Sequence, residues 1–287
     1  MNSLNRRHDN GLALGSALRA IRECGYPSNV PALFPMLTAL RPRRTAFGLV
    51  LMAWLFPAVG MALVGPSSED PALDKHVVMI LIRDGGKAGF CSGVVLGPSA
   101  ILTAGHCVKP VRDMRVFYRD ASGASVFTEV RSVVRHPQFK EDAVARRVVS
   151  IDLALIETTK PIDSRFSALD LDATGETAVG QSLDAAGYGV AREGEQNSAG
   201  VLRSAKLAVR EPLSRVLVWA ADPNGAGAGA CTGDSGGPIL SDGGTRLLAS
   251  IAWSQGAPGS HCGALTQGIL VAPVRDWIRA TIEAWRR

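Results

Sequence analysis

The sequence CTGDSGGP at residues 231–238 is the most informative stretch of this chain, because it places a serine in a glycine-rich turn. A serine hydroxyl attacks a carbonyl carbon only when a base removes its proton and nearby amides stabilise the resulting oxyanion. Glycine adopts backbone conformations that other residues avoid, so the chain can turn sharply on both sides of Ser235. We therefore predict that Ser235 is a nucleophile and that the amides of Gly233 and Ser235 form an oxyanion hole.

A histidine and an aspartate able to activate Ser235 lie upstream of it. His106 occurs in the sequence LTAGHC of residues 102–107, and Asp152 interrupts the apolar run of residues 151–155. An acid among apolar residues is costly to bury without a partner, which favours a place beside a histidine. The three side chains are 46 and 83 residues apart, so only tertiary structure can unite them.

This chain order of His, Asp and Ser resembles that of the chymotrypsin/trypsin serine proteases. Shorter matches occur in the expected order: FCSG at 90–93, HPQF at 136–139, GYG at 187–189, Ala252-Trp253 and Trp277-Ile278. The resemblance covers residues 63–287 and indicates a secreted, bacterial-type member. It implies an all-β fold of two six-stranded antiparallel β-barrels with a C-terminal α-helix. His106 and Asp152 would come from the first barrel and Ser235 from the second.

The residue pattern independently favours an all-β fold, because short apolar and β-branched runs alternate with turn residues. These runs lie at 77–82, 94–96, 115–118, 129–134, 154–156, 183–186, 202–209, 216–219, 247–253 and 269–271. One helix is predicted at the end of the chain, where apolar residues recur at helical spacing. They are Val274, Trp277, Ile278, Ile282 and Trp285.

Residues 1–62 differ in composition from the rest of the chain. The formal charge of +5 comes from these residues, which hold seven arginines and two acids, while the remainder holds 24 basic and 24 acidic residues. A neutral remainder gives no reason to expect a nucleic acid as a partner.

The end of this segment has the pattern of a secretory signal peptide. Three arginines precede an apolar core at about 45–62, and small residues close it. We predict a leader (1–62) and a protease domain (63–287) that is secreted or periplasmic, with Met36 as the start if the leader has an ordinary length. The alternative is an anchor in the inner or plasma membrane, because the uncharged run of residues 45–65 is long enough to span a bilayer.

Four cysteines follow the leader, and an even number fits an oxidising compartment. Four cysteines allow three pairings, and the residues alone do not choose among them. The resemblance implies the pairs Cys91–Cys107 and Cys231–Cys262.

The resemblance also implies a role for each residue of the site. Ser235 would attack the scissile carbonyl, His106 would pass its proton to the leaving amine, and Asp152 would orient His106. Asp234 would pair with the free α-amino group of the mature chain. Leu63 follows an alanine that suits signal peptidase, so removal of the leader would itself create this activating terminus.

The primary substrate pocket would be built from Gly229, Ala230, Trp253, Ser254 and Gly268. Trypsin-like members carry an aspartate six residues before the nucleophile, where this chain has Gly229. An uncharged floor between small walls predicts an apolar or aromatic side chain before the scissile bond. The alternative is that a shifted loop brings Asp222 into the pocket.

Three positions depart from the family pattern. Pro66 replaces a glycine near the expected terminus, Gly105 replaces an alanine before the histidine, and Ala252 replaces a serine that usually hydrogen-bonds the catalytic aspartate. The last change would leave Asp152 with one partner fewer.

These features predict a monomeric serine endopeptidase that cleaves polypeptides through an acyl-enzyme. No cofactor or metal is expected, because the sequence has no HExxH, no metal-binding Cys/His spacing and no phosphate-binding glycine loop. One alternative is a catalytically silent, protease-like binding module, and another is a membrane-tethered protease. A quality-control protease is disfavoured, since such proteins typically have asparagine where this chain has Asp234 and lack these disulfides.

Overall fold

The computed structural model describes residues 63–146, 148–171 and 174–287. The predicted signal peptide, the alternative membrane anchor and the start at Met36 all lie outside the described residues. Within the described residues, no helix has the length and apolar character needed to cross a membrane.

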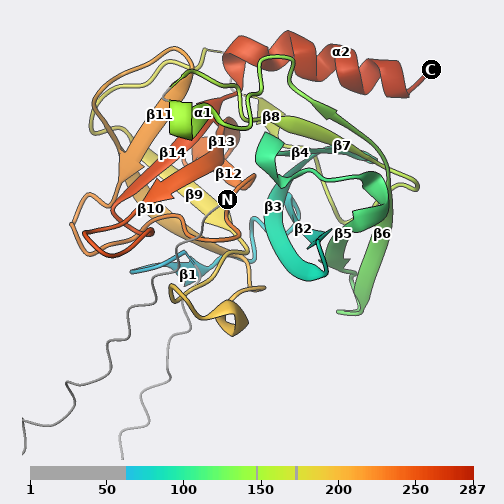
Figure 1. The fold of residues 1–287 in the computed structure, drawn as a ribbon, viewed down its shortest axis with the longest axis horizontal. Helices are drawn as coiled ribbons and strands as arrows, with labels where there is room; N and C mark the ends of the chain where they lie inside the picture. Colours follow the sequence, from blue (N-terminus) through green and yellow to red (C-terminus); the bar gives the residue numbers. More distant parts are fainter. Residues whose placement is uncertain (1–62, 147, 172–173) are drawn as a thin grey trace, which may run out of the picture. The chain divides into compact units, whose positions relative to one another are not determined.

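The first barrel is closed by six antiparallel strands in the order β2-β3-β4-β7-β6-β5 (Figure 1). In β5, the buried residues Met114, Val116 and Tyr118 alternate with more exposed ones, because successive side chains of a strand point to opposite faces. The buried side chains fill the barrel together with Val78 and Ile80. The strands are β2 (Val77–Asp84), β3 (Lys87–Gly97), β4 (Ala100–Thr103), β5 (Met114–Arg119), β6 (Ser125–Arg135) and β7 (Ala154–Thr158).

The second barrel also has six antiparallel strands, in the order β10-β11-β14-β13-β12-β9, and the β9–β10 pair closes the ring. Alternation is regular along β10, whose residues Ala205, Leu207 and Val209 are buried. The strands are β9 (Ser182–Gly187), β10 (Arg203–Arg210), β11 (Leu217–Ala221), β12 (Pro238–Ser241), β13 (Arg246–Gln255) and β14 (Leu265–Leu270). Two short strands add to this barrel: β1 (Ser68–Glu69) pairs antiparallel with β10, and β8 (Asp170–Leu171) pairs parallel with β13.

Helix α2 (Arg275–Trp285) closes the chain and buries Ile278, which is 1 % exposed. Its other apolar residues pack against the same core, as the helical spacing predicts. A single-turn helix, α1 (Ala143–Arg146), lies between β6 and β7. The four 3-10 turns in the described part are η1 (Gly105–Cys107), η2 (Val111–Asp113), η3 (Gln196–Ser198) and η4 (Ala272–Val274). Two barrels and one C-terminal helix confirm the predicted architecture.

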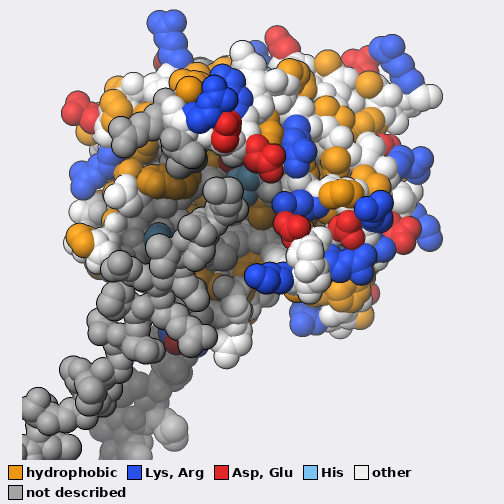
Figure 2. All heavy atoms as spheres, viewed as in Figure 1, with side chains coloured by type: hydrophobic (Ala, Val, Ile, Leu, Met, Phe, Trp, Pro, Cys, Tyr) orange, Lys and Arg blue, Asp and Glu red, His pale blue; other side chains and the backbone are white. Residues whose placement is uncertain are grey.

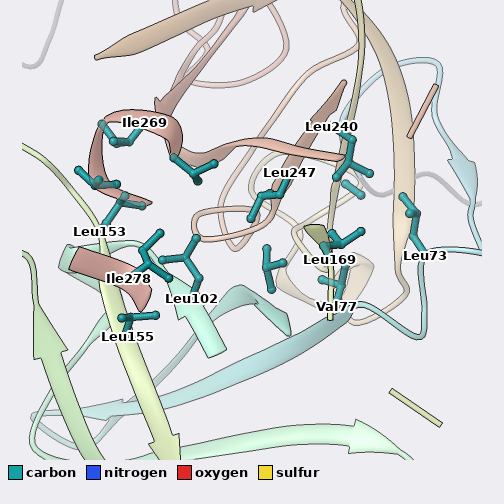
Figure 3. Packing of buried hydrophobic residues seen from close by; sticks show 14 of the residues in the cluster. Leu73, Val77, Leu102, Leu153, Leu155, Leu169, Leu240, Leu247, Ile269 and Ile278 are labelled. Carbon is teal, nitrogen blue, oxygen red and sulfur yellow. The ribbon is translucent and has the colours of Figure 1, made fainter. Parts of the chain in front are cut away.

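An apolar cluster packs between the two barrels. Leu102 and Leu155 come from the first barrel and Leu240 and Ile269 from the second, all within one group of buried residues (Figure 3). Leu153, which follows Asp152 in the chain, is 0 % exposed in this cluster. Burial of this leucine therefore fixes the backbone that carries the aspartate.

Candidate active site

His106 and Asp152 are in direct contact. The histidine lies in η1, just after β4, and its Nδ1 is 2.7 Å from Asp152 Oδ2. The backbone amide of His106 donates to Asp152 Oδ1 at 2.9 Å, so the carboxylate holds both the ring and the backbone. A carboxylate only accepts hydrogen bonds, so Nδ1 carries the hydrogen and the neutral ring keeps its basic lone pair on Nε2.

The turn that carries His106 is held from two sides. Arg135 donates from Nε to the Gly105 carbonyl at 3.0 Å and from Nη2 to the Val108 carbonyl at 2.5 Å. Its guanidinium lies 5.5 Å from the centre of the Phe139 ring. On the other side, the Cys91–Cys107 disulfide ties the turn to β3.

The structure explains why Gly105 departs from the usual alanine. A Cβ at this position would lie 2.7 Å from Phe139 Cδ2 and 3.0 Å from Asp152 Oδ1. The Phe139 ring therefore occupies the space of the missing methyl group, and the two residues form a matched pair.

We expect Gly105→Ala to destabilise the protein by about 1–3 kcal/mol through overpacking and to lower kcat/KM, because the displaced groups flank the His106 turn. The double variant Gly105→Ala/Phe139→Leu should recover much of both losses, since the smaller side chain vacates this space. Thermal denaturation and steady-state kinetics of the wild type, the single variant and the double variant test this. A Gly105→Ala protein with the stability and kcat/KM of the wild type would contradict the prediction.

The nucleophile turn is shaped by glycines in the left-handed region. Gly233 has φ +96° and Gly236 has φ +85°. A Cβ on Gly233 would lie 2.0 Å from the Phe90 ring, so no larger residue fits there. Ser235 is half-buried. In the described part of the chain, neither the Gly233 amide nor the Ser235 amide donates a hydrogen bond to the protein, so both are free to bind an oxyanion.

One cleft of about 880 Å³ contains all four of these residues: His106, Asp152, Gly233 and Ser235. Its wall also includes apolar side chains from both barrels, among them Phe139 and Leu217. On the face drawn in Figure 2, basic and acidic side chains are interspersed over the described part, as the neutral composition of residues 63–287 predicts. The sulfurs of Cys91 and Cys107 lie within 4.8 Å of a His106 ring nitrogen, but they form a disulfide and offer no thiolate to a metal.

The predicted pocket residues separate into two groups. Trp253 and Ser254 line the cleft, whereas Gly229, Ala230 and Gly268 do not. The assignment of Gly268 to the pocket wall needs correction, because a Cβ there would lie 2.6 Å from Ile239 Cδ1, in the core of the second barrel.

Thr266, and not the predicted Gly268, lies opposite Ser254 in the sheet. Ser254 pairs with Thr266 in the β13–β14 ladder, after a register shift between Ile251 and Trp253. The Thr266 hydroxyl accepts a hydrogen bond from the Ala230 amide at 2.9 Å. Sequence reasoning missed this residue because a bulge in a strand leaves no clear signal in a single sequence.

Asp222 does not line the cleft. Its carboxylate accepts hydrogen bonds from the amides of Asn224, Ala226 and Ala228 at 2.8, 2.9 and 3.1 Å. These backbone hydrogen bonds lower the pKa of Asp222. The residue therefore orders its own loop, and the structure gives no support to Asp222 as a counter-charge for a basic substrate.

Asp234 is fully buried behind the nucleophile turn. Its Oδ1 accepts from the Gly189 amide at 2.8 Å and its Oδ2 from the Cys231 amide at 2.9 Å. Burial raises the pKa of Asp234 to about 7, although the two amide hydrogen bonds act in the opposite direction. Among the described residues, no cation forms an ion pair with this carboxylate.

The segment that begins at Leu63 is docked against the residues that precede the nucleophile turn. Leu63 is 0 % exposed, and the Gly229 amide donates to the Val64 carbonyl at 3.1 Å. The second disulfide, Cys231–Cys262, lies at the start of the nucleophile turn. Both disulfides are those that the resemblance implies.

Ala252 lines the cleft and offers no hydroxyl to Asp152.

Comparison with known proteins settles the family. The trypsin family model matches residues 64–278, which is most of the chain. The chain belongs to the trypsin family. With the fold described above, this makes the protein a serine endopeptidase.

Several relatives show how far this trypsin-family similarity extends. The chain is 25 % identical to a trypsin of Simulium vittatum, over 75 % of this chain and 93 % of that protein. It is 26 % identical to the putative trypsin-6 of Homo sapiens, over 79 % and 96 %. These relatives come from animals, so they do not support the expectation of a bacterial-type member.

Solved structures agree on the fold. Mouse neuropsin, described as a serine protease, aligns with a TM-score of 0.58 at 22 % identity, over 71 % of this chain and 93 % of that one. The protein described as GrC aligns with a TM-score of 0.63 at 20 % identity, over 76 % and 98 %. At these identities the likeness concerns the fold alone.

Proposed function

We propose that the protein hydrolyses peptide bonds in polypeptides through an acyl-enzyme, with Ser235, His106 and Asp152 as its triad. One observation carries the proposal. An imidazole bonded to a carboxylate at 2.7 Å shares a cleft with a serine whose turn offers two free amides. Nucleophilic acyl transfer needs these parts together.

The roles follow from the hydrogen bonds. Because Asp152 accepts from Nδ1, the free lone pair of His106 is on Nε2, which takes the Ser235 proton as the hydroxyl oxygen attacks the carbonyl carbon. The carbonyl electron pair moves onto oxygen, and the Gly233 and Ser235 amides stabilise that charge. His106 then gives its proton to the leaving amine, and water releases the acyl group by the same steps.

A fluorophosphonate probe tests this function. The folded protein should be labelled at Ser235, as peptide mapping by mass spectrometry would show, while heat-denatured protein and Ser235→Ala should not be labelled. Absence of label on the folded mature protein, or equal label on Ser235→Ala, would favour a catalytically silent binding module instead.

We further propose that the enzyme acts outside the cytoplasm, once removal of the leader has exposed Leu63 as its terminus. Two disulfides in the described residues support an oxidising compartment. The buried Leu63 supports the terminus, because the Val64 carbonyl that follows it accepts from the amide of Gly229, in the segment that leads to Asp234. Mass spectrometry of the secreted protein should give Leu63 as the first residue, and any other terminus would overturn this part.

We propose that the side chain before the scissile bond is apolar, and small rather than aromatic. Ser254 lines the cleft, and its cross-strand partner Thr266 is 0 % exposed and does not line the cleft itself. Because paired residues project to the same face, Thr266 fills the space beside Ser254 that a glycine would leave open. A peptide-library profile should favour Ala or Val over Phe, Arg and Lys, and Thr266→Gly should shift it towards larger apolar residues. A preference for Arg or Lys in the wild type would contradict the assignment.

A further inference from the structure

We propose that Ser92 is a positioning residue for the oxyanion hole. Its buried hydroxyl ties the Gly233 carbonyl of the nucleophile turn to β3 of the first barrel. The inference rests on the proposed function, because it assigns a task to a residue outside the triad and outside the cleft.

Ser92 holds the nucleophile turn at two points. It is 0 % exposed and follows Cys91 in β3. Its backbone amide donates to the Ser235 carbonyl at 2.8 Å, and its Oγ donates to the Gly233 carbonyl at 2.9 Å. One residue of the first barrel therefore fixes two carbonyls on either side of Asp234, and these fixed peptide planes restrict rotation of the backbone that carries the Gly233 and Ser235 amides.

The same hydroxyl reaches a third segment. The Tyr188 amide donates to Ser92 Oγ at 2.9 Å, so the hydroxyl donates one hydrogen bond and accepts another. Tyr188 precedes Gly189, whose amide holds the carboxylate of Asp234. Ser92 thus links β3, the segment behind the turn and the turn itself at one buried point.

Loss of this hydroxyl would leave two buried backbone groups without partners. Among the described residues, no other group donates to the Gly233 carbonyl or accepts from the Tyr188 amide. An unsatisfied buried group is costly, so the peptide after Gly233 would rotate to find a new partner. That rotation would misplace the amides, which matter most when the oxyanion forms, so kcat should fall while KM changes little.

Thr103 supplies a matched control. It is also 0 % exposed, and its Oγ1 donates to the Ser92 carbonyl at 2.8 Å. Thr103→Val therefore removes one buried hydroxyl from the same layer without removing a hydrogen bond to the nucleophile turn. Ser92→Thr is the conservative variant, because it keeps the hydroxyl.

The test compares catalysis with the binding of a transition-state analogue in the mature enzyme. In a peptide trifluoromethyl ketone, the Ser235 oxygen adds to the ketone carbon, its proton passes to His106, and the carbonyl electron pair becomes an oxyanion. We expect Ser92→Ala to lower kcat by about 10- to 100-fold and to weaken the ketone by a similar factor. Binding of a product peptide and KM should stay within about threefold, as expected when only transition-state binding is lost. Thr103→Val should lose thermal stability to a comparable extent and keep its kcat.

The outcomes separate positioning from packing. Wild-type kcat and ketone affinity in Ser92→Ala would overturn the proposal, and so would an equal loss of kcat in Thr103→Val. If Ser92→Ala does not fold, the decision rests on Ser92→Thr, whose hydroxyl must preserve kcat and ketone affinity. A wild-type enzyme that neither cleaves peptides nor reacts with the fluorophosphonate would defeat the proposed function itself, which is a different result.

Discussion

We expect Asp152→Asn to lower kcat by about four orders of magnitude while the protein stays folded. The reason lies in how the carboxylate is held. Its Oδ1 accepts from the backbone amide of His106, which can only donate. In the variant, the side-chain oxygen of the asparagine must take the position of Oδ1, opposite the His106 amide. The NH2 group of the asparagine then takes the position of Oδ2 and faces Nδ1 of His106.

This arrangement would reverse the tautomer of His106. With an NH2 donor opposite Nδ1, that nitrogen must accept, and the ring hydrogen moves to Nε2. A ring protonated at Nε2 cannot take the Ser235 proton, so general-base catalysis is lost although all three side chains remain in place. The fluorophosphonate reaction, which needs the same base, should slow with kcat.

Asp163→Asn is the matched control, since this aspartate between β7 and β8 accepts a hydrogen bond from the Arg165 amide and does not line the cleft. Its kcat should equal that of the wild type. Steady-state kinetics, probe labelling and thermal denaturation of both variants give the answer. An Asp152→Asn enzyme that keeps more than a tenth of the wild-type kcat would show that Asp152 does not set the tautomer.

The sequence predicted ten of the strands and missed four, of which β1 (Ser68–Glu69) and β8 (Asp170–Leu171) have only two residues each. β4 (Ala100–Thr103) and β12 (Pro238–Ser241) have only four residues each, all of them buried. A short strand covered on both faces shows no alternation, so its pattern does not differ from that of a buried loop. Both strands adjoin the site, since β4 leads to His106 and β12 follows the nucleophile turn.

Within the candidate site, motifs predicted the candidate catalytic residues but not the residues that hold them. Arg135 reaches the His106 turn from 30 residues away, and Ser92 reaches Gly233 across 141 residues. Ser92 lies within the FCSG match at 90–93, but that match does not indicate a partner for its hydroxyl, and no motif contains Arg135. Only the closure of the two barrels brings such pairs together, and the family resemblance implies that closure without its contacts.

Asp234→Asn should lower the kcat of the mature enzyme by about 10²- to 10³-fold, the effect of losing an oxyanion-hole donor. Both carboxylate oxygens accept from backbone amides, so the NH2 group of an asparagine would face a donor at one of them. The variant would also remove the charge that we propose to pair with the amino group of Leu63. Both losses would loosen the turn that carries Gly233, and ketone affinity should fall together with kcat.

The same residue should make the uncleaved chain less stable as the pH rises. In a chain that begins upstream of Leu63, the nitrogen of Leu63 is part of a peptide bond and carries no charge. Burial raises the pKa of Asp234 from 3.8 to about 7 in this chain. The folded state therefore binds the proton more tightly than the unfolded state does. This contribution to stability is complete below pH 4 and is lost as the pH rises through 7.

Urea unfolding of such a chain, carrying Ser235→Ala to prevent self-cleavage, should show less stability at pH 8 than at pH 5. Asp234→Asn in the same background should weaken this slope, because its side chain does not titrate. Cleavage before Leu63 should reverse the effect, since an ammonium group beside the carboxylate favours its charged form. An unchanged slope in Asp234→Asn would mean that Asp234 is not the group that titrates, and the case for an activating ion pair with Leu63 would lose its physical basis.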